Sequence, residues 1–146
     1  MNLQELEQKI STVTSKVVSI EKPAERRIYL TCESQNSFDI CKFLFEDVGC
    51  RFATATGIDS DDYFEILYHF PYDQAGCIVT VKSLIRDKKN PVVESLAGFL
   101  PAAEWIEREL YDLLGIEFKN HPDMRRLILA DDWPEGVYPL RKDRKK

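Results

Sequence analysis

Three carboxylates and one arginine fall close together in the sequence, at Glu107, Arg108, Glu109 and Asp112. Paired carboxylates can act as acid and base if their surroundings shift their pKa values, and they can also bind a metal ion. The stretch has no Glu-x-x-His pattern, which accompanies carboxylates in the metal sites of helical bundles. We therefore expect ion pairs, in which these carboxylates orient the tandem arginines Arg125 and Arg126 through charge-assisted hydrogen bonds.

The two histidines lie in contrasting surroundings. His121 precedes a proline in a polar segment, and its reference pKa of about 6.5 would suit a proton shuttle. It has no cysteine or histidine within eight positions, which makes it a poor metal ligand, and we expect a structural or interface role. His69 lies in an apolar segment, where we expect a hydrogen-bonded structural histidine.

The remaining metal candidates in the sequence are weak. Asp59, Asp61 and Asp62 suggest a calcium loop, but the glycine and the glutamate of an EF-hand are missing, so we expect a solvated turn. No cysteine belongs to a Cys-x-x-Cys pair, and each lies in an apolar neighbourhood. We expect buried, reduced thiols at Cys32, Cys41, Cys50 and Cys77.

Basic residues are concentrated near the C-terminus, at Arg125, Arg126, Arg141 and Lys142. No glycine-rich loop precedes a helix, so a phosphate site has little support, whereas the arginine fork suits carboxylates of a partner protein. The last six residues, Arg-Lys-Asp-Arg-Lys-Lys, could contact nucleic acid or anionic lipid, but short charged termini are usually solvated. Residues 1–116 contain 12 Lys/Arg against 19 Asp/Glu, and residues 117–146 contain 8 against 6. A nucleic-acid binder is more often basic overall.

The composition fits one globular domain, because 44% of the 146 residues are hydrophobic. The N-terminus does not resemble a secretory signal, and no apolar run approaches the roughly 18 residues that span a bilayer. We expect a cytoplasmic location, with membrane association only through a partner.

Hydrophobic periodicity predicts the elements that must position these side chains. Apolar residues at helical spacing predict helices at residues 2–13, from 36 or 37 to 48, and 101–114. Alternating, β-branched segments predict strands at 16–20, 27–33, 51–57, 63–70 and 76–86. We expect an α+β fold for residues 1–116, with a mostly antiparallel sheet and helices on one face.

The C-terminal tail, residues 117–146, is expected to be extended and irregular. It is too short to form a core of its own, so a partner must order it if it is ordered at all. Its aromatic and apolar residues, which include Trp133, Tyr138 and Leu140, are typical of interface anchors. The sequence therefore favours a docking segment of the same domain.

The charged motifs together resemble the signature of the 30-kDa subunit family of complex I. The resemblance lies in Glu107-Arg108-Glu109, Asp112, Gly115-Ile116, Phe118, His121-Pro122-Asp123, Arg125-Arg126 and Pro139-Leu140-Arg141-Lys142-Asp143. The segment Asp131-Asp132-Trp133-Pro134-Glu135-Gly136 looks more like relatives from the energy-converting nickel–iron hydrogenase branch.

The resemblance implies a non-catalytic peripheral subunit that carries no cofactor of its own. In that family the subunit packs against a large catalytic subunit, and its tail wraps over that neighbour. Iron–sulfur clusters and a nickel–iron centre, or quinone and flavin, are expected in partner subunits. The residues expected to fix the tail or contact the partner are Glu107, Arg108, Glu109, Asp112, His121, Arg125, Arg126, Trp133, Tyr138, Pro139, Leu140, Arg141, Lys142 and Asp143.

Two other classes of function remain open from the residues alone. A stand-alone enzyme would use the carboxylates and His121 as acid and base in a closed pocket. A nucleic-acid or anionic-membrane binder would use the basic terminus and would lose binding as salt rises.

Overall fold

The computed structural model describes residues 3–12 and 16–142. Its centre is a five-stranded sheet in the order β1-β2-β5-β4-β3. The strands are β1 (Ser19–Ala24), β2 (Arg27–Glu33), β3 (Thr54–Asp59), β4 (Phe64–Tyr72) and β5 (Cys77–Ile85). Within this sheet only the β2–β5 pair is parallel, so the predicted α+β class with a mostly antiparallel sheet is confirmed.

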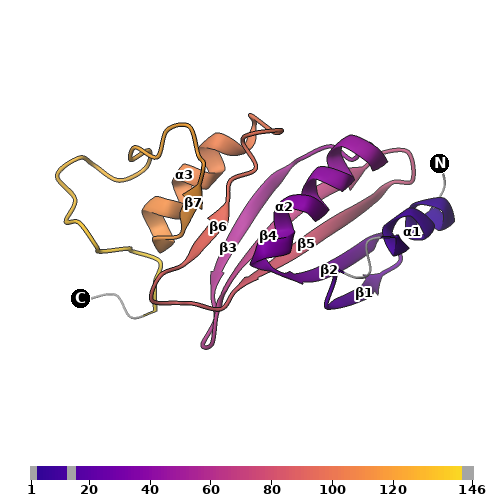
Figure 1. The fold of residues 1–146 in the computed structure, drawn as a ribbon, viewed down its shortest axis with the longest axis horizontal. Helices are drawn as coiled ribbons and strands as arrows, with labels where there is room; N and C mark the ends of the chain where they lie inside the picture. The colour runs from indigo at the N-terminus through magenta and orange to yellow at the C-terminus, as the bar shows by residue number, and fades with distance from the viewer. Residues whose placement is uncertain (1–2, 13–15, 143–146) are drawn as a thin grey trace.

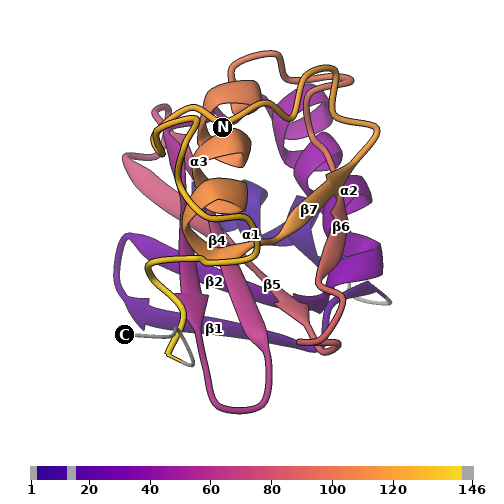
Figure 2. The same ribbon diagram turned by 90° about the vertical axis from the view of Figure 1, so that its left-hand side faces the viewer.

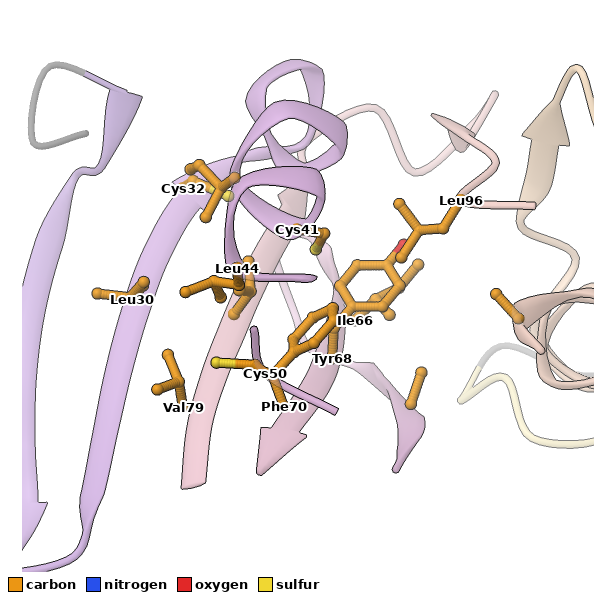
Figure 3. Close-up of a cluster of buried hydrophobic side chains, with 14 of the residues drawn as sticks. Leu30, Cys32, Cys41, Leu44, Cys50, Ile66, Tyr68, Phe70, Val79 and Leu96 are labelled. Atoms are coloured by element: carbon orange, nitrogen blue, oxygen red, sulfur yellow. The ribbon is translucent and has the colours of Figure 1, made fainter. Parts of the chain in front are cut away.

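The strand register gives the sheet one apolar and one more polar face. Paired positions Gly57, Ile66, Ser83 and Cys32 lie in one row across β3, β4, β5 and β2, and paired residues share a face. Helix α2 (Ser34–Lys42) and its π-helical continuation η2 (Phe43–Val48) cover that face. Figure 3 shows side chains of β4 meeting those of α2 and η2 there, and the buried core lies between them.

Two other helices complete the fold. Helix α1 (Leu3–Ser11) buries its apolar side through Leu6 and Ile10. Helix α3 (Ala103–Leu114) lies over β3, beside α2 on the same side of the sheet (Figure 1, Figure 2). It approaches the sheet closely because Gly57 has no side chain: a Cβ there would lie 2.5 Å from Leu114 Cδ1.

Strand β1 differs from the prediction. It spans Ser19–Ala24 rather than 16–20, and the turn falls at residues 25–26 instead of 22–25. Pro23 therefore lies inside a strand. This is tolerated because β1 is an edge strand, whose outer side needs no backbone donor.

A second, two-stranded sheet was not predicted. Strand β6 (Val92–Glu94) lies between the predicted strand at 76–86 and the predicted helix at 101–114, and it pairs in parallel with β7 (Glu117–Lys119). Each has three residues, too few for alternation to stand out, and only Val93 and Phe118 are buried. The expected C-terminal tail thus begins with a strand, and residues 120–142 contain no helix or strand. Among the described helices, none is long and apolar enough to cross a membrane.

Candidate functional site

The C-terminal tail runs over the outer side of α3, where Figure 1 shows it as the yellow-orange trace beside the helix. The inner side of α3 is buried through Leu110 and Leu114. The same helix carries Glu107, Arg108, Glu109 and Asp112, so its contacts decide what these charged residues do.

Glu107 faces the protein interior rather than the tail. Its Oε1 accepts a hydrogen bond from Ser95 Oγ at 2.7 Å, and its Oε2 accepts one from the Leu96 N–H at 3.1 Å. The side chain is fully buried. Burial raises the pKa of Glu107 to about 7, although the two hydrogen bonds act in the opposite direction. This carboxylate therefore fixes the loop before α3.

The side chain of Arg108 binds backbone carbonyl groups of the tail. Its Nε donates to the carbonyl oxygen of Arg125 and its Nη2 to that of Arg126, both at 2.8 Å. The guanidinium also lies 5.2 Å from the ring centroid of Trp105, within the range of a cation–π contact. Arg108 thus links the exposed Trp105 to the tail.

Asp112 is the second anchor of the tail. Its Oδ2 accepts hydrogen bonds from three successive backbone N–H groups, those of Leu127, Ile128 and Leu129, at 2.7 to 3.2 Å. Successive N–H groups that converge on one anion form a nest. This single carboxylate therefore sets the path of the chain over three residues.

The tandem arginines have other partners than we expected. Arg125 pairs with Asp123, at 2.7 Å between Nη2 and Oδ2, and this pairing holds the pKa of Asp123 at about 2. Arg126 Nη1 donates to the carbonyl oxygens of Ala130 and Asp131. Within the described residues, no hydrogen bond joins Glu109 to either arginine. The prediction that the α3 carboxylates orient these arginines was wrong, because the helix binds the tail's main chain instead.

His121 links the start of the tail to α3. One ring nitrogen, Nε2, lies 3.0 Å from the Glu104 carbonyl oxygen, and Nδ1 accepts the Asp123 N–H at 2.9 Å. Nε2 therefore carries the hydrogen and donates it. His69, in β4, lies between the hydroxyl groups of Thr56 and Thr80, so its predicted structural role is confirmed.

The Pro-Leu-Arg-Lys string holds the far end of the tail against α3. Leu140 N–H donates to Leu113 O at 2.9 Å, and Arg141 Nε donates to Leu114 O at 2.6 Å. The Arg141 guanidinium lies over the rings of Tyr138 and Phe64, at 4.6 and 5.1 Å from their centroids. Arg141 thus satisfies an end carbonyl of α3, which has no partner within the helix.

The acidic end of β3 and the turn after it also hold the tail, a role that the sequence analysis missed. The Lys142 N–H donates to Asp59 Oδ2 at 2.8 Å, and Lys142 Nζ lies 3.1 Å from Asp61 Oδ1. Lys88 pairs with the other oxygen of Asp59. Burial tends to raise the pKa of Asp59, but these partners outweigh it and keep that pKa below its usual range. Only the complementary charges of the two segments could have indicated this contact.

The remaining predicted contact residues lie in the middle and at the end of the tail. Trp133 Nε1 donates to Val137 O at 2.8 Å, and Tyr138 packs edge-on against Tyr111. Pro139 is half-buried and Leu140 is exposed. Asp143 lies outside the described residues.

The tail and α3 line a pocket of about 380 Å³ that is partly open to solvent. Tyr111, Asp112, Arg126, Trp133 and Tyr138 contribute to its lining. Nearby, Arg108, Arg125 and Arg126 border a more open depression. No group of three or more His, Cys, Asp or Glu side chains with metal-binding geometry occurs in residues 3–12 and 16–142.

The four cysteines are buried and free, as predicted. Burial raises the pKa of Cys32 and of Cys50 to about 12, which disfavours the reactive thiolate.

The chain matches a family model described as "Respiratory-chain NADH dehydrogenase, 30 Kd subunit" over residues 30–146. It is 38% identical over 120 residues to a subunit of NADH-quinone oxidoreductase from Rhizobium meliloti, covering 78% of this chain and 58% of that protein. It is 34% identical to the equivalent protein of Sinorhizobium medicae, covering 97% of this chain and 71% of that protein. The chain spans little more than half the length of several of these curated relatives.

Two solved structures share the fold. One chain in the structure of the membrane-bound sulfane sulfur reductase, an archaeal respiratory membrane complex, has a TM-score of 0.84 at 24% identity, covering 97% of this chain and 85% of that one. The trypsin-resistant fragment of Nqo5 has a TM-score of 0.69 at 19% identity, covering 84% of this chain and 99% of the fragment. At these identities the likeness concerns the fold.

Proposed function

The chain belongs to the family of the 30 Kd subunit of respiratory-chain NADH dehydrogenase, and from this premise we propose that it is a non-catalytic peripheral subunit of a complex I-like, membrane-bound oxidoreductase. It docks on the large catalytic subunit at the cytoplasmic face of the membrane. It supports electron transfer coupled to ion translocation without carrying out chemistry itself.

The observation that carries this proposal is the way in which α3 holds the tail. The side chains of Arg108 and Asp112 bind backbone groups of the tail. The side chains of those tail residues therefore do not take part in these bonds. Apolar side chains on α3 and on the tail remain outside: Trp105, Ile128 and Leu140 are 61%, 56% and 55% exposed. Exposed apolar and aromatic groups on an ordered segment are typical of a docking surface.

The cofactors of the proposed complex lie in its other subunits. Iron–sulfur clusters accompany either a nickel–iron centre in a hydrogenase-type complex or flavin and quinone sites in an NADH:quinone oxidoreductase. The curated relatives are named as subunits of NADH-quinone oxidoreductase, which supports the quinone-linked branch. The Asp131–Gly136 segment supports the hydrogenase branch. Metal and flavin analysis of the isolated complex distinguishes the two.

The test is affinity isolation of the tagged chain from gently solubilised membranes. The triple variant Trp105→Ser, Ile128→Ser, Leu140→Ser should recover at least about tenfold less large subunit than the wild type, because apolar interface anchors are often worth more than 1 kcal/mol each. The matched control is Val18→Ser with Ile20→Ser. These residues are also exposed but lie beside or in β1, away from the tail (Figure 1).

Equal recovery with both variants would contradict the assignment of this surface. A wild-type chain that recovers no other subunit would contradict the proposed function as a whole.

A further inference from the structure

Three arginines border the open depression beside α3, which has a volume of about 470 Å³. Arg108 comes from the helix and Arg125 and Arg126 come from the tail, and Asp131 completes the lining. The fold thus brings together cations from two segments that lie 17 and 18 positions apart. Like charges at one place repel each other, so a cluster of this kind favours an anionic ligand.

Two of the three guanidinium groups are fixed by the tail and still have free donors. Arg108 uses Nε and Nη2 for two backbone carbonyl oxygens, and Arg126 uses Nη1 for two others. A guanidinium has five N–H donors. Among residues 3–12 and 16–142, neither Nη1 of Arg108 nor Nε and Nη2 of Arg126 has an acceptor. Because these side chains are already held in place, a ligand would bind them at a low cost in conformational entropy.

The third guanidinium is the most accessible one. The side chain of Arg125 is 83% exposed, whereas Arg108 and Arg126 are half-buried. Arg125 binds Asp123 through Nε and Nη2, and its Nη1 has no acceptor in the described part of the chain. A ligand that enters from solvent can therefore reach this donor first.

The charge of the depression matches one carboxylate. The three arginines carry three positive charges, and Asp131 together with Asp123, the partner of Arg125, carries two negative ones, so one positive charge remains. The carboxylate of Asp112 is buried and is bound by the three N–H groups of its nest. Nucleic acid and anionic membranes are bound through many cations, and a single excess charge is too small for them.

The depression adjoins apolar residues of the proposed docking surface. The guanidinium of Arg108 lies 5.2 Å from the ring centroid of Trp105, which is 61% exposed. Ile128, which is 56% exposed, follows Arg126 by two positions. Apolar neighbours that exclude water strengthen a charge pair at an interface. The anion is therefore expected to belong to the protein that covers these residues.

We propose that the depression receives a carboxylate side chain of the large subunit, which the free N–H donors of Arg108, Arg125 and Arg126 bind. The arginine fork matches the geometry of a carboxylate. The inference rests on the proposed function, because it names the chemistry by which the partner is recognised. Arg108 and Arg126 then have two roles, since they hold the tail and also bind the partner.

The first test removes one positive charge and keeps the bonds between helix and tail. In Arg125→Gln the backbone carbonyl at this position still accepts from Arg108, and the depression no longer has a net charge. We expect the affinity-isolated complex to dissociate at least about tenfold faster than the wild type, as for other truncated charge pairs at interfaces.

The matched control for this variant is Arg51→Gln. Arg51 forms the same kind of exposed pair, with Asp73. It precedes β3, whereas the tail contacts the other end of that strand at Asp59. The control should leave the dissociation rate within about twofold of the wild type.

The second test changes the charge in the opposite direction. Asp131→Asn leaves the depression with two positive charges instead of one and keeps the backbone carbonyl that Arg126 binds. We expect the complex to dissociate at least about threefold more slowly. The neighbouring Asp132 is exposed and is not part of the lining, so Asp132→Asn should stay within about twofold of the wild type. Arginines that only ordered the tail would not produce this gain.

Three results would overturn the inference. One is dissociation of Arg125→Gln no faster than that of Arg51→Gln, and another is faster dissociation of Asp131→Asn than of the wild type. The third is binding of the isolated chain to phosphatidylglycerol vesicles that Arg125→Gln abolishes, with unchanged dissociation from the large subunit. That result would assign the arginines to anionic lipid.

The two proposals fail in different ways. If the wild-type chain brings down no partner, the proposed function fails. If it brings down the large subunit but Arg125→Gln and Asp131→Asn dissociate like the wild type, only the carboxylate site fails. Amide NMR shifts of residues 127–129 in the isolated variants show whether the tail keeps its path. If Arg125→Gln disturbs them, Asp131→Asn decides alone.

Discussion

At the scale of single residues, the charged side chains of α3 act on main-chain groups. Asp112 alone satisfies three backbone N–H groups and Arg108 two backbone carbonyls. Hydrogen bonds to charged groups contribute roughly 1.5–3 kcal/mol each. Two side chains thus fix a stretch of irregular chain that has no regular structure to stabilise it.

Glu107 should make the stability of the protein depend on pH. Its pKa is raised to about 7 in the fold from an ordinary value of 4.5, chiefly by burial. The protonated form is therefore favoured in the native state, and this stabilisation, of order 3 kcal/mol, is complete below about pH 4.5 and is lost as the pH rises through about 7.

Replacement of the carboxyl by an amide should remove this dependence. In Glu107→Gln the amide can still accept from Leu96 N–H and donate to Ser95 Oγ. Chemical denaturation at about pH 5 and about pH 8 should show a smaller difference in unfolding free energy than in the wild type. An unchanged difference would mean that Glu107 does not titrate as described.

At the scale of elements, the end of α3 and the tail depend on one glycine. Gly115 has φ of 74° and ends the helix in the left-handed conformation. A Cβ at this position would lie 2.5 Å from Tyr138 Cε2 and 2.6 Å from Arg141 Nη2. The positive φ at the helix end and the close packing of the tail therefore both require a glycine at this position.

Gly115→Ala should cost more than the backbone strain alone. The strain of a non-glycine residue with positive φ is about 1 kcal/mol, and displacement of Tyr138 and Arg141 adds to it. Gly49→Ala is the matched control, because Gly49 has φ of 89° and open space around its Cβ position. Thermal denaturation should show a larger loss for Gly115→Ala, and equal losses would contradict the close packing of the tail.

Much of the element pattern was predictable from the sequence. The apolar spacing of α3, with Gly115 after it, predicted the helix and its end to within two residues. Strands β6 and β7 were not predictable, because three residues carry too little alternation and their pairing joins distant segments. The edge position of β1, which allows Pro23 inside a strand, appears only in the assembled sheet.

The sequence indicated several residues of the candidate site but not the contacts that they make. The sequence identified Arg108, Asp112 and Arg141. Their partners are backbone groups, which every residue has, so the residue types of the tail do not indicate these bonds. The contact of Lys142 with Asp59 spans 83 positions, and no local pattern indicates so distant a partner.

At the scale of the whole molecule, the tail is tied to the domain at several separate points. His121 holds its start, the Asp112 nest holds its middle, and Arg141 with Lys142 holds its end. The sequence suggested a tail that a partner must order. The structure instead has an irregular segment that α3 and the segment around Asp59 already hold, so the surface that we propose for docking is formed by the chain itself.

The most direct test of this account is amide hydrogen exchange on the isolated chain. We predict that the Leu127–Leu129 and Leu140 amides are protected without any partner, because each donates to a buried or helix-end acceptor. Exchange of these amides as fast as in an unfolded peptide, with the sheet amides still protected, would contradict a tail that is ordered in the isolated chain.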